Sequence, residues 1–170
     1  PGWKSSSGSK TKEGNLLRDD PSNLLPSTLK VQDKKGNLIF HINTHGQCVI
    51  NYVETLGHAV VSNNTGVFSA IKDKDNWFTT HPGIPAPKVS TEGDRIIIEN
   101  ILFGEKDNPI NEKWIFHSCS DFIDWTIERS YPGNRTLEDT GFPQWSFDNM
   151  DTWTGALLGT GGVAWCKFFD

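Results

Sequence analysis

The chain has 170 residues, of which 35% are hydrophobic and 11% aromatic, with 16 glycines and 9 prolines. This length suffices for one domain with a sizeable core, and the aromatic content argues against intrinsic disorder. The net charge of −5 disfavours nucleic-acid binding through a basic patch. No apolar run approaches the roughly 20 residues that span a bilayer, so neither nucleic acid nor membrane is expected as a partner.

The first segment, residues 1–26, is predicted to be a tail or linker packed on the domain that follows. Gly, Ser, Lys, Asp and Pro dominate it, and Pro21 and Pro26 interrupt any helix. A short helical turn over 13–18 is the regular element expected there. The chain opens on Pro rather than Met and stops at Asp170 in an apolar, strand-like segment. We therefore expect it to be part of a longer protein.

Residues 27–170 are predicted to form one all-β domain, an antiparallel β-sandwich or supersandwich with long loops and no substantial helix. Short runs of β-branched and aromatic residues alternate with Gly, Asn and Asp turns, which is typical of antiparallel strands. The expected strands are 28–32, 38–43, 47–53, 57–62, 66–71, 95–103, 112–120, 122–131, 145–147, 153–158 and 163–168. Residues 73–93 are expected to be a loop, in which a proline-rich stretch follows a Trp-Phe pair.

The run from Phe122 to Trp165 places four tryptophans among carboxylates, an arginine and glycines. A sugar ring stacks its apolar C–H face on Trp and pairs its hydroxyls with polar side chains, so this mixture indicates a sugar-binding surface. Strand alternation assigns Trp125 to the core side. Trp77, Trp145 and Trp153 lie in Pro- or Asp-flanked segments and are ligand candidates. The alternative is that each is a buried core anchor.

Two polar residues of the same region complete the candidate site. Arg129 continues an apolar stripe beside Tyr131, and its guanidinium can pair with vicinal hydroxyls or with a carboxylate. The alternative is a structural ion pair with a carboxylate such as Glu138 or Asp139. Asp148 follows the FPQWSF segment on the opposite side of any strand there. The candidate carbohydrate-binding residues are Trp77, Arg129, Trp145, Asp148 and Trp153.

Other kinds of site lack a complete motif. Cys48, Cys119 and Cys166 form no CxxC, which excludes a zinc ribbon or redox motif and leaves their pairing open. His41 and His45 share a face of an extended strand, but no HExxH or third ligand accompanies them. No GxSxG or GxxxxGK[ST] occurs either. No metal, cofactor or catalytic carboxylate pair is therefore predicted.

The stretches DFIDWTIERSY, FPQWSFDN and DTWTGALLGTGGVAW resemble the N-terminal β-supersandwich domains of large bacterial glycoside hydrolases and related polysaccharide-active enzymes. Those domains have a galactose-mutarotase-like topology, and the resemblance covers residues 27–170. It implies a non-catalytic accessory domain that lines or supports a sugar cleft. The partners implied are an oligosaccharide or polysaccharide and a helical catalytic domain that follows Asp170. The expected location is secreted or periplasmic.

Two other functions stay open. One is a self-standing carbohydrate-binding module or lectin, which would bind sugar as an isolated fragment. The other is a small mutarotase-like enzyme, in which His81 or His117 would carry acid–base chemistry together with Glu128.

Overall fold

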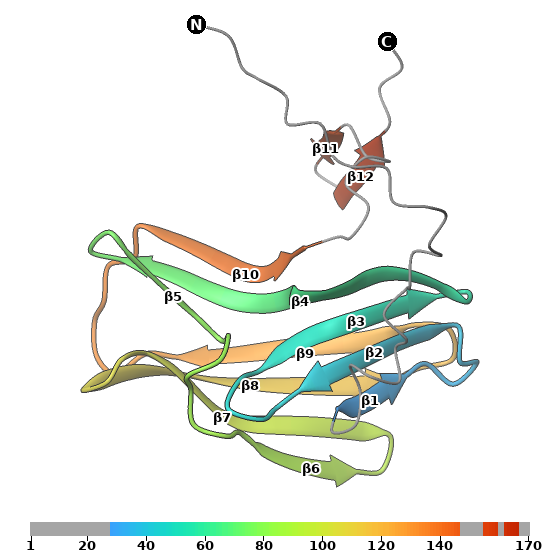
Figure 1. The fold of residues 1–170 in the computed structure, drawn as a ribbon, viewed down its shortest axis with the longest axis horizontal. Coiled ribbons are helices and arrows are strands. Elements are labelled where there is room, and N and C mark those ends of the chain that lie inside the picture. The colour runs from blue at the N-terminus through green and yellow to red at the C-terminus, as the bar shows by residue number, and fades with distance from the viewer. Residues whose placement is uncertain (1–27, 147–154, 160–161, 167–170) are drawn as a thin grey trace, which may run out of the picture.

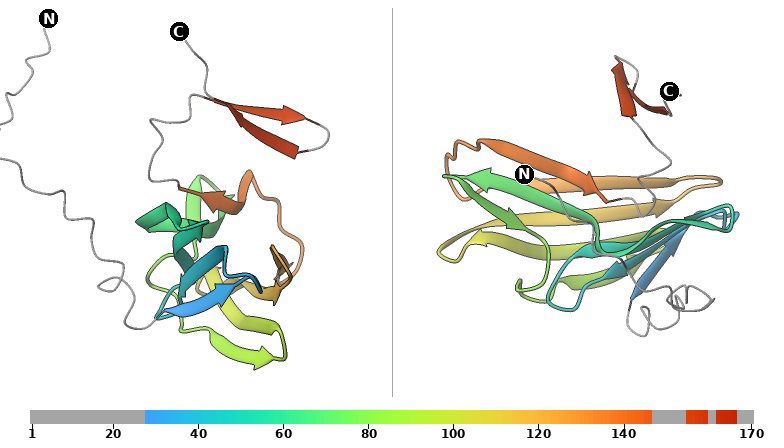
Figure 2. Two further views of the ribbon diagram at one scale, coloured as in Figure 1. Left: turned by 90° about the vertical axis from the view of Figure 1, so that its right-hand side faces the viewer. Right: turned by 45° about the horizontal axis from the view of Figure 1, so that its top comes forward.

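Two antiparallel β-sheets pack against each other as a β-sandwich, which confirms the predicted fold class (Figures 1 and 2). The structure is a computed structural model that describes residues 28–146, 155–159 and 162–166. None of these residues is helical. The segment 1–26, with its expected helical turn, and the candidates Asp148 and Trp153 lie outside the described residues.

The first sheet, sheet A, has six strands in the order β1-β2-β3-β4-β10, and β5 pairs with β4 as well. Their bounds are β1 Leu29–Gln32, β2 Leu38–Asn43, β3 Val49–Thr55, β4 His58–Asp73, β5 Asn76–Thr79 and β10 Asp139–Trp145. The first part of β4 pairs with β3, whereas its last residues pair with β5 along one edge and with β10 along the other. Strand β4 therefore connects the part of sheet A that contains β1, β2 and β3 with the part that contains β5 and β10.

Strand β4 is continuous where the sequence predicted two strands, 57–62 and 66–71. The Asn-Asn-Thr-Gly segment between them is a β-bulge, because Tyr52 of β3 lies opposite Ser62 whereas Ile50 lies opposite Val67. Gly66 has a φ of 61° there, a conformation that glycine adopts without steric cost. A turn-like sequence can thus interrupt the pairing without ending the strand.

The second sheet, sheet B, has the order β6-β7-β8-β9. Its bounds are β6 Lys88–Glu92, β7 Arg95–Glu105, β8 Asn108–Ser118 and β9 Ile123–Ser130. Strands β5 and β6 both fall within residues 73–93, which the sequence predicted to be a loop, so the loop is shorter than expected. Its three prolines, which lack a backbone donor, lie between the two strands. Strands β11 (Gly155–Gly159) and β12 (Gly162–Cys166) pair with each other.

The core lies between the sheets and follows strand alternation. Ile110, Glu112, Trp114 and Phe116 of β8 all point inward, and each is at most 1% exposed. The ring of Trp125 on β9 stacks on Phe116, with centroids 5.2 Å apart. Trp125 also contacts Trp114 edge-on. The prediction that Trp125 faces the core is confirmed.

The free cysteines among the described residues, Cys48 and Cys119, form no disulfide with each other. Cys48 is fully buried, and this burial raises the pKa of its thiol well above the ordinary value, with the nearby Glu112 carboxylate adding to the effect. Cys48 therefore behaves as a small apolar core residue.

His41 on β2 is partly buried against its neighbours. Its ring packs edge-on against Tyr52, and its Nδ1 lies 3.2 Å from Thr28 Oγ1. Burial is the main reason why its pKa lies below the ordinary 6.5, and Lys30 lowers the pKa further while Glu54 opposes both.

We expect this histidine to make the domain less stable as the pH falls. The folded state binds a proton at His41 less readily than the unfolded chain does. The contribution of the neutral ring to the free energy of unfolding is therefore complete above the unfolded pKa, and it is lost as the pH falls toward the folded pKa. An NMR titration of the ring should give a pKa below 6.5. In His41→Gln, the fall in the free energy of unfolding between pH 7 and pH 5 should be smaller. An unchanged slope would contradict the prediction.

Candidate functional site

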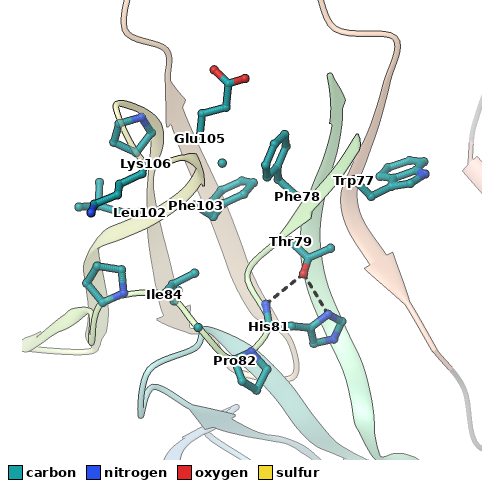
Figure 3. A pocket seen from close by; sticks show the side chains of 14 residues that line it. Trp77, Phe78, Thr79, His81, Pro82, Ile84, Leu102, Phe103, Glu105 and Lys106 are labelled. Carbon is teal, nitrogen blue, oxygen red and sulfur yellow. Dashed lines mark hydrogen bonds between the residues drawn. The ribbon is translucent and has the colours of Figure 1, made fainter. Parts of the chain in front are cut away.

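A pocket of about 610 Å³ opens between β5, the loop 81–87 and the β7–β8 hairpin (Figure 3). Its apolar walls come from both sheets: Phe78, Ile84, Pro85, Leu102, Phe103 and Pro109. Glu105 and Lys106, in the hairpin, add one side chain of each charge. The volume and the mixture of many apolar groups with few polar ones are typical of small-molecule sites.

The Trp-Phe pair of β5 is divided between the two faces of sheet A. Phe78 lies opposite Ile71, which is fully buried, and Trp77 lies opposite Lys72. Because residues directly opposite each other share a face, Phe78 packs against the core while Trp77 faces outward and is 51% exposed. In Figure 3 the indole of Trp77 accordingly extends away from Phe78. Phe78 anchors the strand, and Trp77 presents an aromatic surface beside the pocket.

The loop 81–87 is held in place by hydrogen bonds at both of its faces. The backbone N–H groups of Gly83 and Ile84 donate to Gly46 O at 3.0 and 3.2 Å. The His81 ring lies 2.9 Å from Thr65 O through Nε2, and its centroid is 4.2 Å from that of Phe68. These contacts fix one wall of the pocket before any ligand arrives, which favours binding.

The opposite wall is braced by Arg135, from the segment between β9 and β10. Its side chain is 7% exposed; Nε lies 3.3 Å from Asp73 Oδ2 and Nη2 lies 3.7 Å from Glu105 Oε2. Nη2 also donates to Asn108 O at 3.1 Å. Glu105 is thereby oriented by a buried cation, whereas Lys106 is exposed and makes no ion pair within the part of the chain that the structure describes.

Arg129 lies between the sheets in an ion pair. Its Nε donates to Glu112 Oε1 at 2.5 Å, and its Nη1 donates to Thr140 Oγ1 of β10 at 2.8 Å. Glu112 is fully buried and also accepts a hydrogen bond from Trp114 Nε1 at 2.8 Å. The sequence left open whether Arg129 pairs with sugar hydroxyls or with a carboxylate. The structure contains an ion pair with a carboxylate, and that carboxylate belongs to Glu112.

Neither acidic residue that the sequence suggested as a partner holds this arginine. Glu138 pairs with Lys72 at 2.7 Å, and this hydrogen bond is the largest reason why the pKa of Glu138 is lowered. Asp139 Oδ1 accepts a hydrogen bond from Thr140 N. Glu112 was not among the candidates, although its position two residues before Trp114 on a core strand placed both side chains on one face.

Trp145 does not share a surface with Trp77. It is 39% exposed and lies opposite Val67 on β4, a fully buried residue of the core face. Trp77 lies opposite Lys72, which is on the other face of the same strand because the two partners are five positions apart. The two described tryptophan candidates therefore do not form a single flat platform, and only Trp77 lines the pocket.

The histidines do not form an acid–base pair with Glu128. His117 lies opposite Asp124 on β9, so Glu128 is four residues farther along that strand, roughly 13 Å away. The His81 ring contacts Thr65 and Phe68 of β4 in sheet A, whereas Glu128 is on β9 in sheet B. Within the described ranges, no group of three or more His, Cys, Asp or Glu side chains is arranged to hold a metal ion.

Comparison with protein-family models, with curated proteins and with solved structures found no match for the chain. In the described part, no helix has the length and apolar character needed to cross a membrane. The function is therefore inferred from the pocket and the side chains around it.

Proposed function

We propose that this β-sandwich is a non-catalytic accessory domain of a carbohydrate-active enzyme of the glycoside hydrolase type, and that it binds saccharide at the pocket beside Trp77. The observation that carries the proposal is the 51% exposed indole next to a pocket that also holds Glu105 and Lys106. Such an enzyme would be secreted or periplasmic and would carry its catalytic groups on a helical domain after Asp170.

The chemistry of the pocket suits a sugar better than a purely apolar ligand. The C–H face of a sugar ring can stack on the indole of Trp77, as other apolar surfaces do on aromatic rings. The hydroxyl groups of another unit of the same saccharide, inside the pocket, can donate to the carboxylate of Glu105 and accept from the ammonium group of Lys106. The nearby Arg135, whose Nη2 lies 3.7 Å from Glu105 Oε2, favours a position of this carboxylate at the pocket wall.

The carboxylates of the pocket support binding rather than hydrolysis as the proposed role. Glycoside hydrolysis needs two carboxyl groups that flank the scissile bond. Among the described residues that line the pocket, Glu105 carries the single carboxylate, and it is paired with Arg135. The catalytic acids of the complete enzyme would therefore come from elsewhere.

Isothermal titration with a panel of cello-, xylo-, manno- and galacto-oligosaccharides tests the proposal. We expect one series to bind with a micromolar to millimolar dissociation constant, and Trp77→Ala to weaken that binding about ten-fold or more. Phe122→Ala, which removes another exposed ring (54%), is the matched control and should bind as the original protein does. Circular dichroism should show that each variant stays folded.

Two results would overturn the proposal. One is the absence of binding to every member of the panel, and the other is unchanged affinity in Trp77→Ala. If Trp145→Ala were the variant that lost binding, the sugar would bind at the end of β10, and the pocket assignment would be wrong.

A further inference from the structure

A second pocket, of about 280 Å³, opens on the other side of the loop 81–87. It is lined by five carboxamide side chains and one proline, which come from β2, the β2–β3 connection, β3, the bulge of β4 and the loop: Asn43, Gln47, Asn51, Asn63, Asn64 and Pro82. We refer to it as the carboxamide pocket. In the part of the chain that the structure describes, no charged side chain lines it. The site beside Trp77 includes none of its carboxamides.

Two of the carboxamides hold the walls of this pocket in place. Asn51 Nδ2 donates to the backbone oxygens of Asn63 and Asn64, both at 3.2 Å. Asn63 Oδ1 accepts from Gly66 N at 2.7 Å, and its Nδ2 donates to Ser146 O at 3.0 Å. The bulge of β4 is thus fixed to β3 on one side and to the end of β10 on the other. A ligand would meet a preformed site.

The other carboxamides keep hydrogen-bonding groups for a ligand. Within the described ranges, the side-chain amides of Gln47 and Asn64 make no hydrogen bond. Asn43 uses only its Oδ1, which accepts from His45 N at 3.0 Å, and Asn51 uses only its Nδ2. The pocket therefore offers both N–H donors and carbonyl acceptors, without a formal charge.

We infer that the carboxamide pocket is a second subsite, which binds a neutral sugar unit of the same saccharide chain. This inference rests on the proposed function. The amides of Gln47 and Asn64 can each donate to one hydroxyl and accept from its neighbour, which matches the vicinal hydroxyls of a sugar. A uronate, sulfate or phosphate group would find no countercharge among the lining residues.

The position of Pro82 connects the two sites. This residue lines both the pocket beside Trp77 and the carboxamide pocket. In Figure 3 it lies at the end of the loop, next to His81 and away from the hairpin that carries Glu105. A saccharide chain that binds beside Trp77 can thus continue over Pro82 into the carboxamide pocket. That pocket would hold only the sugar units that lie farther from Trp77.

The dependence of affinity on chain length tests this order of subsites. The double variant Gln47→Ala/Asn64→Ala removes amides that make no structural hydrogen bond. For the oligosaccharide series that the original protein binds, we expect the double variant to bind the hexasaccharide about ten-fold more weakly. The disaccharide should bind unchanged, because it occupies only the site beside Trp77. Asn134→Ala, in an exposed segment, is the control and should alter neither affinity.

The outcomes separate this inference from the proposed function. If Trp77→Ala abolishes binding while the double variant binds every chain length normally, the second subsite is wrong and the proposed function stands. Equal losses for the disaccharide and the hexasaccharide would overturn the order of the subsites. If the original protein binds no saccharide of the panel, both the proposed function and the subsite are overturned.

Discussion

Glu112→Ala is expected to lower the free energy of unfolding by about 3–5 kcal/mol, because it leaves the buried guanidinium of Arg129 without its anion. The carboxylate of Glu112 is fully buried, and Arg129 and Trp114 both donate to it. The substitution therefore removes a charge partner and two hydrogen bonds in one step. Urea-induced unfolding, followed by tryptophan fluorescence, gives the change in free energy.

The double variant Glu112→Met/Arg129→Met separates the charge from the packing. Apolar residues of similar volume often replace a buried ion pair at little cost, so we expect the double variant to be much more stable than Glu112→Ala. A Glu112→Ala variant as stable as the original protein would show that water reaches Arg129 and that the pair has no structural role. Trp125, which contacts Trp114 and Phe116, should report any rearrangement of the aromatic cluster.

Gly66→Ala is expected to destabilise the domain by about 3 kcal/mol, through backbone strain and steric overlap together. A Cβ atom at this position would lie 2.3 Å from Ile50 O and 2.8 Å from Val49 Cγ1. The φ of 61° adds the cost of a left-handed conformation for a residue with a side chain. Because the clash involves a backbone oxygen, the strand itself has to move.

Gly57→Ala is the matched control for this substitution. Gly57 also has a positive φ, of 79°, but nothing lies within 4 Å of a Cβ atom built there. Only the conformational cost applies, so we expect a loss of about 1–2 kcal/mol. Equal losses for the two variants in urea unfolding would contradict the steric part of the argument.

Strand alternation and turn residues were sufficient to predict the sandwich. Strand β2 has the predicted bounds, 38–43, because turn residues flank a run of apolar side chains. Strand β6, with the sequence KVSTE, was missed, because it is an edge strand with a largely exposed surface and gives little hydrophobic signal. The strand is held by backbone hydrogen bonds to β7, which do not depend on the type of side chain and so leave no pattern in the sequence.

The candidate site was harder to predict because it depends on contacts between distant residues. Alternation placed Arg129 correctly on the inner face of its strand, but it could not identify Glu112 as the partner. Similarly, the brace formed by Arg135 with Asp73 and Glu105 joins three separate segments. The exposure of Trp77 depends on the pairing of β5 with β4, which the sequence did not predict.

The pairing of β10 with β4 has a consequence for assembly of the fold. Every other strand pair of the described residues joins strands that follow one another along the chain, whereas Asp139 meets Lys72 some 67 positions away. Closing so long a loop costs conformational entropy, so this edge forms after the local hairpins. Until then, residues 67–73 of β4, VFSAIKD, expose unpaired backbone groups along an apolar strand, which is a template for intermolecular pairing. We therefore expect β10 also to cover this edge and to limit aggregation of the nascent sheet.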